Sequence, residues 1–92
     1  MVTVNFSSAM QSVTGGNREM EIDFEGTVDA LFARLSSILG DEFRRRVCED
    51  GNRVRRYINV YVDGKDIRFL EGQKTLLGKN SVVDIVPAVS GG

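Results

Sequence analysis

One segment of this chain, residues 28–39, carries its apolar side chains at the spacing of an α-helix, and other segments, both earlier and later in the chain, alternate like strands. The apolar positions of this segment recur every three or four residues and so share one helical face: Val28, Leu31, Phe32, Leu35, Ile38 and Leu39. Thr27 is suited to be the N-cap, and Gly40 can adopt the left-handed conformation that ends a helix. An amphipathic helix needs a sheet to cover, which predicts an α+β fold.

Two strands are predicted before the helix. Val2, Val4 and Phe6 alternate with polar residues within residues 2–8, as in a strand with one buried face. Turn-forming residues at 14–17 follow, and the alternation then restarts, which predicts a hairpin. The acidic side chains of the second strand share its other face, which we interpret as solvated rather than catalytic: Glu19, Glu21, Asp23 and Glu25.

The region after the helix begins with residues 41–56, which carry six arginines and four acids. We interpret it as an extension of the helix that runs into a surface loop. A hairpin is predicted next, with an alternating strand at residues 57–62, a tight turn at Asp63-Gly64, and Ile67 and Phe69 on the returning strand.

The last strand is predicted at residues 82–86, after a turn-rich segment in which Leu76 and Leu77 are expected to be tucked under the fold. Residues 82–86 are nearly all apolar, as in a strand buried on both faces. Proline cannot donate a ladder hydrogen bond, so Pro87 should end the pairing. If the first and last strands are central neighbours, they run parallel and the helix crosses one face of the sheet.

This order of elements predicts the ubiquitin-like β-grasp arrangement, a mixed sheet of four to five strands wrapped around one main helix. Ninety-two residues suffice for one domain. We assign residues 1–87 to that domain and residues 88–92 to a flexible tail that ends in Gly-Gly.

The composition excludes several classes of enzyme. The chain has no histidine and one cysteine, so a zinc site, a histidine-dependent triad and an intramolecular disulfide are excluded by count. The net charge of −1 gives the whole chain no electrostatic reason to bind polyanions or membranes. No apolar run is long enough to cross a bilayer, and the N-terminus lacks the core of a signal peptide, so we expect a cytoplasmic protein.

The C-terminal tail is the candidate for chemistry. It consists of small residues, and its terminal carboxylate is expected to be accessible. Glycine lacks a Cβ atom, so Gly91 and Gly92 would let another backbone or a nucleotide approach closely. Val89 and Ser90 complete a segment that can thread into the active site of a partner while the body of the protein stays outside.

Two stretches of this sequence resemble the ubiquitin-like sulfur carriers, the family that includes the small subunit of molybdopterin synthase (MoaD), the thiamine-pathway carrier (ThiS) and the cysteine-biosynthesis carrier (CysO). The stretches are Arg56-Tyr-Ile-Asn-Val-Tyr-Val-Asp-Gly-Lys-Asp-Ile-Arg-Phe69 and Asn80-Ser-Val-Val-Asp-Ile-Val-Pro-Ala-Val-Ser-Gly-Gly92. Both look closest to the cysteine-pathway branch. A typical molybdopterin carrier has an aromatic residue and two prolines where this chain has Val86-Pro87-Ala88.

The resemblance implies a carrier protein rather than an enzyme, with no bound cofactor. A ubiquitin-activating-type partner would use ATP to adenylate the carboxylate of Gly92, and a sulfur donor would convert the adenylate to a thiocarboxylate. The sulfur acceptor would be a cysteine synthase-like enzyme or the large subunit of molybdopterin synthase. Val89, Ser90 and Gly91 would thread the tail into these partners.

Two other hypotheses remain open. The first is a ubiquitin-like modifier that is conjugated through Gly92 to lysines. The second is an interaction or RNA-binding module that uses the arginine-rich loop at residues 44–56, although a solvated loop and no bound nucleic acid are what we expect there.

Two further features have simple interpretations. Cys48 lies among charged residues that could lower its pKa, and we interpret it as incidental. Val60 and Phe69 are candidates for a docking patch for the activating enzyme if they point outward.

Overall fold

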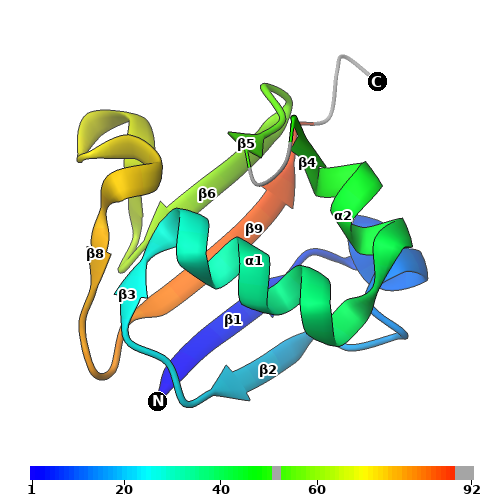
Figure 1. Ribbon diagram of the computed structural model, residues 1–92, viewed down its shortest axis with the longest axis horizontal. Helices are drawn as coiled ribbons and strands as arrows, with labels where there is room; N and C mark the ends of the chain where they lie inside the picture. The colour runs from blue at the N-terminus through cyan, green and yellow to red at the C-terminus, as the bar shows by residue number, and fades with distance from the viewer. Residues whose placement is uncertain (51–52, 89–92) are drawn as a thin grey trace.

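The computed structural model describes residues 1–50 and 53–88. Its five-stranded sheet has the order β2-β1-β9-β6-β7, in which β1 and β9 are parallel and every other pair is antiparallel. Figure 1 shows α1 (Val28–Leu39) lying across one face of this sheet. The strands of the sheet are β1 (Val2–Phe6), β2 (Glu19–Ile22), β6 (Ile58–Val62), β7 (Lys65–Asp66) and β9 (Val82–Pro87). The predicted β-grasp architecture, with the first and last strands parallel at the centre, is confirmed.

The core lies between the sheet and α1. Strands β1 and β6 bury every second residue, as their alternating sequences predict. On the helix, the predicted stripe is buried at four positions, namely Val28, Leu31, Phe32 and Leu35. Ile38 is 50% exposed, so its assignment to the core was wrong. Ile38 lies in the last turn of α1, beyond Leu35, the last fully buried residue of the stripe.

Both predicted ends of α1 are confirmed. The hydroxyl of Thr27 accepts a hydrogen bond from the amide of Ala30, as an N-cap does. Gly40 ends the helix with a φ of +101°, a backbone conformation that other residues rarely adopt.

Residues 41–50 and 53–56 contain more regular secondary structure than the sequence suggested. Instead of an extension of α1, a second helix, α2 (Asp41–Val47), begins after Gly40, and a short hairpin of β4 (Cys48–Glu49) and β5 (Arg53–Val54) follows. The apolar residues Phe43 and Val47 are four apart on α2 and are fully buried. The ring of Phe43 meets that of Phe6 edge to face, with centroids 6.1 Å apart. This packing holds the arginine-rich segment against the sheet.

The hairpin after β6 is shorter than predicted. Strand β7 ends at Asp66, and Ile67 and Phe69 belong to a 3-10 helix, η2 (Ile67–Phe69). A second one, η3 (Gly72–Lys74), leads into β8 (Leu76–Leu77), which pairs with β3 (Gly26–Thr27). Because neighbouring strand residues face opposite ways, Leu77 is buried while Leu76 is 75% exposed. Only one of these two leucines is therefore tucked under the fold.

Strand β9 is central but is not buried on both faces. Val83 and Ile85 point into the core, whereas Val82, Asp84 and Val86 on the open face are half-buried. The sequence also gave no sign of the 3-10 helix η1 (Ser8–Val13) between β1 and β2. Its Met10 is fully buried, which closes the core at that end.

Candidate functional site

The described part of the chain ends beside the start of β6. Pro87 is the last residue of β9 and pairs with Ile58. The amide of Ala88 then donates a hydrogen bond to the carbonyl of Tyr57. We call Tyr57, Ile58, Pro87 and Ala88 the tail root. In Figure 1 it lies at the upper end of the sheet, away from β2.

The residues predicted to carry the chemistry, Val89, Ser90, Gly91 and Gly92, lie outside the described residues. Their roles and the division of the chain at residue 87 therefore remain predictions. Pro87 is where β9 ends, as predicted, although the Ala88 amide adds one more bond to β6.

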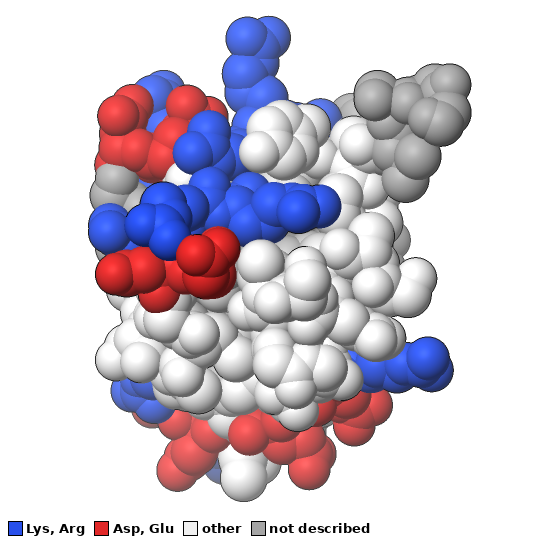
Figure 2. All heavy atoms as spheres, turned by 90° about the vertical axis from the view of Figure 1, so that its right-hand side faces the viewer, with Lys and Arg blue, Asp and Glu red and all other residues white. Residues whose placement is uncertain are grey.

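Arginines from two elements gather near the tail root. We call Arg44, Arg45, Arg46, Arg53, Arg55 and Arg56 the basic pole. Figure 2 shows basic side chains forming a band on this part of the surface. Three of them form ion pairs three residues apart: Arg44 with Asp41 at 3.8 Å, Arg45 with Glu42 at 2.8 Å, and Arg53 with Asp50 at 3.9 Å. The Arg55 side chain donates to the carbonyl of Arg45 at 2.9 Å, which joins the loop to α2.

Cys48 lies beneath the basic pole and not at the surface of a charged loop. Its exposed fraction is 2%. Burial raises the pKa of its thiol, although the charges of Arg44 and Arg55 act in the opposite direction. The predicted lowering of this pKa by positive neighbours is therefore present, but burial, which the sequence did not reveal, outweighs it. The buried thiol is a packing residue, as its incidental interpretation implies.

The two candidates for an apolar docking patch point in opposite directions. Val60 is 2% exposed and belongs to the core, so it does not form an outward-facing patch. Phe69 is 87% exposed, and Leu70 beside it is 40% exposed. Exposed aromatic side chains of this kind are frequent anchors in protein interfaces.

An ion pair fixes the strand that precedes Phe69. The guanidinium of Arg68 contacts the carboxylate of Asp66 at 2.7 Å and donates to the side-chain oxygen of Asn59 on β6 at 2.7 Å. These hydrogen bonds lower the pKa of Asp66 and raise that of Arg68. The edge of the sheet next to Phe69 is thus held in one arrangement.

A hollow of about 250 Å³ lies between this edge and the tail root. Its floor includes the buried side chains of Ile58, Val60 and Ile67, and its rim carries Arg56 and Arg68. Asp66 also lines the hollow, and its carboxylate is paired with Arg68. An apolar floor with charged edges suits a partner side chain.

The predicted acidic face is confirmed as solvated. Glu19, Glu21, Asp23 and Glu25 are all exposed. Among residues 1–50 and 53–88, no three His, Cys, Asp or Glu side chains are grouped so as to hold a metal ion. Within the same ranges, no helix is long and apolar enough to span a membrane.

The fold and the tail root define a ubiquitin-like protein of the β-grasp class. The sequence model of the ThiS family matches residues 4–92. The chain belongs to the ThiS family.

Known proteins that resemble the chain are carriers and modifiers. A putative sulfur carrier protein of Archaeoglobus fulgidus is 37% identical over 75 residues, which is 80% of this chain and 84% of the relative. The CysO protein in a crystal structure of the Amycolatopsis orientalis BexX/CysO complex has a TM-score of 0.86 and 29% identity, and each chain covers the other completely. The small archaeal modifier protein 1 of Methanosarcina acetivorans has a TM-score of 0.82 and 28% identity, covering 99% of this chain and 95% of that one.

The sequence did not predict that Tyr57 belongs to the tail root or that Arg56 precedes it there. Their position follows from the pairing of Ile58 with Pro87, which sets the register between β6 and β9. The sequence predicts the two strands, β6 and β9. Alternation alone does not determine which residues pair when two strands are far apart in the chain.

Proposed function

We propose that this chain is a sulfur carrier whose C-terminal carboxylate, that of Gly92, is the group that is modified. An ATP-dependent adenylating enzyme would activate it: a carboxylate oxygen attacks the α-phosphorus of ATP, and pyrophosphate leaves. A sulfide equivalent from a sulfur donor then attacks the carbonyl carbon, the C–O bond to AMP breaks, and a thiocarboxylate remains. The carrier acts in the cytoplasm, where ATP and reduced sulfur are available.

The observation that supports this proposal best is the family match, which extends through the terminal glycines to residue 92. The geometry agrees with it. The tail root is held by the central strand, so the segment after Ala88 begins at a fixed point on the surface. The thiol of Cys48 is buried, and the proposed chemistry at Gly92 does not use it.

Val89, Ser90 and Gly91 would form the segment that enters the active sites of the partners. Small residues suit a narrow channel, and ordering them costs roughly 1–2 kcal/mol of backbone entropy per residue. The affinity must therefore come mainly from the folded surface, where Phe69 and the rim of the hollow at the tail root are available.

For the acceptor of the sulfur, we propose a cysteine synthase-like enzyme rather than the large subunit of molybdopterin synthase. The similarity to CysO over the whole chain supports this choice. The presence of CysO in a complex with BexX also supports the idea that a carrier of this fold docks on a partner protein.

A second candidate function is supported by the similarity to a small archaeal modifier protein. In that case a lysine amine on a target protein attacks the activated carbonyl of Gly92, AMP leaves, and an isopeptide bond forms. Both functions pass through the same adenylate. They differ only in the nucleophile that displaces AMP, which is a sulfide equivalent for the carrier and a lysine amine for the modifier.

Intact-mass spectrometry separates these functions. The chain is incubated with ATP, the adenylating enzyme of the source organism and sulfide. A mass gain equal to the exchange of one oxygen for sulfur, absent from a chain that lacks Gly91 and Gly92, supports the carrier. ATP-dependent conjugates of high mass support the modifier, and an unchanged mass refutes both.

A further inference from the structure

The charges of this molecule are separated into two poles. The basic pole contains six of the twelve Lys and Arg residues. Six arginines against four acids leave residues 41–56 with a net charge of +2. Residues 19–25 carry four acids and no basic residue, a charge of −4, and we call these acids the acidic pole. A chain with a net charge of −1 is therefore strongly dipolar.

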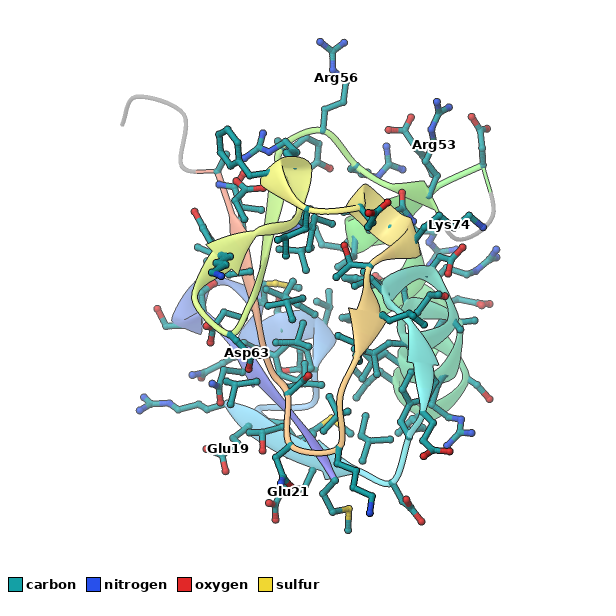
Figure 3. All side chains as sticks on the ribbon, turned by 90° about the vertical axis from the view of Figure 1, so that its left-hand side faces the viewer. Glu19, Glu21, Arg53, Arg56, Asp63 and Lys74 are labelled. Atoms are coloured by element: carbon teal, nitrogen blue, oxygen red, sulfur yellow. The ribbon has the colours of Figure 1, made fainter. Side chains whose placement is uncertain are left out.

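The two poles lie at opposite ends of the molecule. In Figure 3, Arg53 and Arg56 lie at the top, and Glu19 and Glu21 lie at the bottom. In Figure 2, seen from the other side, acidic side chains gather at the bottom, whereas the basic side chains of the upper part lie among acidic ones. Arg56 extends away from the body of the protein into solvent.

The basic pole lies at the end that carries the tail root. Arg56 precedes Tyr57, the residue whose carbonyl accepts the hydrogen bond of the Ala88 amide. Arg46 and Arg56 are exposed, and neither forms an ion pair with a residue in the described part of the chain. Their charges are therefore available to a partner that approaches the tail.

The distance between a charge and the partner determines how strongly the two interact. The molecule measures 32 × 26 × 24 Å along its principal axes. The Debye length is about 8 Å at physiological ionic strength, so a partner near the tail root senses the basic pole and hardly the acidic one. Net charge is then a poor guide to the interactions of this chain.

We propose that this dipole orients the chain so that its tail root meets an acidic surface of the adenylating enzyme, around the entrance to the active site. The inference rests on the proposed function, because it names the surface that presents Gly92 to that enzyme. The exposed arginines of the basic pole are drawn to the Asp- and Glu-rich surface, whereas the acidic pole lies too far away to contribute strongly, so the chain approaches with its basic pole first.

The observations favour an acidic protein surface over a nucleic acid. Three of the six arginines already contact carboxylates of the same segment. Few phosphates could therefore be neutralised, and the salt-dependent affinity for RNA grows with that number. Tyr57, at 48% exposed, is one aromatic ring and not a series of stacking platforms.

A matched pair of charge reversals tests the proposal. Arg56→Glu lies at the basic pole. Lys79→Glu makes the same change in net charge at the other end, where Lys79 shares a shallow hollow with Asp23 and Glu25. Both side chains are exposed, so both variants are expected to fold. Arg46→Glu serves as a second variant of the basic pole.

The readout is the rate of association with the adenylating enzyme of the source organism in stopped-flow experiments. At about 50 mM salt we expect Arg56→Glu and Arg46→Glu to associate roughly fivefold more slowly than wild type, and Lys79→Glu to change by less than twofold. At about 0.5 M salt these differences should disappear. Equal effects of the reversals at both poles, or none at either, overturn the proposal.

Two further measurements make the outcomes distinguishable. If single-stranded oligouridylate binds the chain more tightly than the enzyme does, and Arg56→Glu abolishes that binding, the basic pole serves nucleic acid and the proposal fails. The gain of sulfur at Gly92 is followed in the same samples. Sulfur gain without a difference between the poles refutes the orientation alone, whereas no sulfur gain in wild type refutes the carrier function and the orientation with it.

Discussion

The amide of Ala88 donates its hydrogen bond to the carbonyl of Tyr57, one residue beyond the last strand pair, Ile58 with Pro87. Four residues follow Ala88 in the sequence. At about 3.3–3.6 Å per extended residue, they reach at most roughly 14 Å. An enzyme that acts on Gly92 must therefore hold its reactive group within roughly 14 Å of Ala88, and so close to Tyr57.

Removal of Gly91 and Gly92 should abolish activation without affecting the fold. The core cluster and the strand ladders that hold the fold are built from residues within 1–50 and 53–88. We expect the melting temperature of the truncated chain to stay within about 1 °C of wild type, while ATP-dependent sulfur gain is lost. Calorimetry and intact-mass spectrometry measure the two effects, and a truncated chain that still supports sulfur transfer would contradict the role of the tail.

Phe69→Ala should weaken docking and leave stability unchanged. The side chain is 87% exposed, so its loss should change the free energy of unfolding by less than about 0.5 kcal/mol. As an interface anchor it should cost about 1–2 kcal/mol of affinity for the adenylating enzyme, measured by titration calorimetry. Leu76→Ala is the control, because Leu76 is 75% exposed on β8, at the other side of the molecule from the tail root in Figure 1. Equal losses in both variants would argue against an anchor at Phe69.

The junction between α1 and η3 should lose stability in acid. The hydrogen bond with the Thr27 hydroxyl, followed by that with Lys74 at 3.0 Å, holds the pKa of Asp29 below its usual range. A lowered folded-state pKa contributes stability above the unfolded-state value, near 4, and this contribution is lost as the pH falls through the folded-state pKa.

Asp29→Asn should therefore destabilise the protein at pH 6, by less than about 1 kcal/mol for so exposed an ion pair, and the difference should shrink below pH 4. Urea unfolding at several pH values measures it. Lys74→Met should remove part of the same contribution, so the double variant should lose less than the sum of the single variants. A difference that does not change with pH would show that the carboxylate charge is not responsible.

The thiol of Cys48 should be almost unreactive in the folded protein. It is 2% exposed, and burial raises its pKa, so both access and thiolate formation are restricted. We expect labelling by a disulfide reagent at pH 8 to be about 100-fold slower in buffer than in denaturant. Fast labelling of the native chain would mean that the segment around β4 opens readily.

Gly40→Ala should destabilise the junction of the two helices. The φ of +101° at Gly40 is strained for a residue with a Cβ atom, at a cost of about 1–2 kcal/mol. Gly78→Ala is the matched control, because Gly78 has no positive φ in this range and its added Cβ would meet only the Ser81 hydroxyl, at 3.5 Å. Denaturant unfolding of both variants measures the difference, and equal stabilities would contradict the role of the backbone conformation.

The sequence predicts the fold well where one periodicity extends over a whole element. The alternation around Val4 and the stripe through Leu35 identify β1 and α1, because burial of one face decides both patterns. Short elements defeat this method. The two buried residues of α2, Phe43 and Val47, are the only helical signal within an arginine-rich segment, and local charge obscured them. Phe69 was assigned to a strand because one turn of 3-10 helix has no period to detect.

The sequence predicts which residues form the candidate tail, but it does not predict which surface lies around the tail root. The small-residue tail and Gly92 are visible as sequence, whereas the surface around the tail root depends on register between strands that are distant in the chain. The pairing of Ile58 with Pro87 sets Arg56 beside the tail, and no local pattern announces it. Likewise, the Val60 side chain points into the core because it lies on the face of the sheet that α1 covers.

The central place of β9 determines how the molecule responds to tension. Strand β9 is hydrogen-bonded to β1 on one side and to β6 on the other. A force applied to the C-terminus acts along these ladders in shear, so many hydrogen bonds resist it at once. An enzyme that draws in the terminus, or a protease that unfolds the chain from that end, therefore acts first on β9 and on the two ladders that hold it.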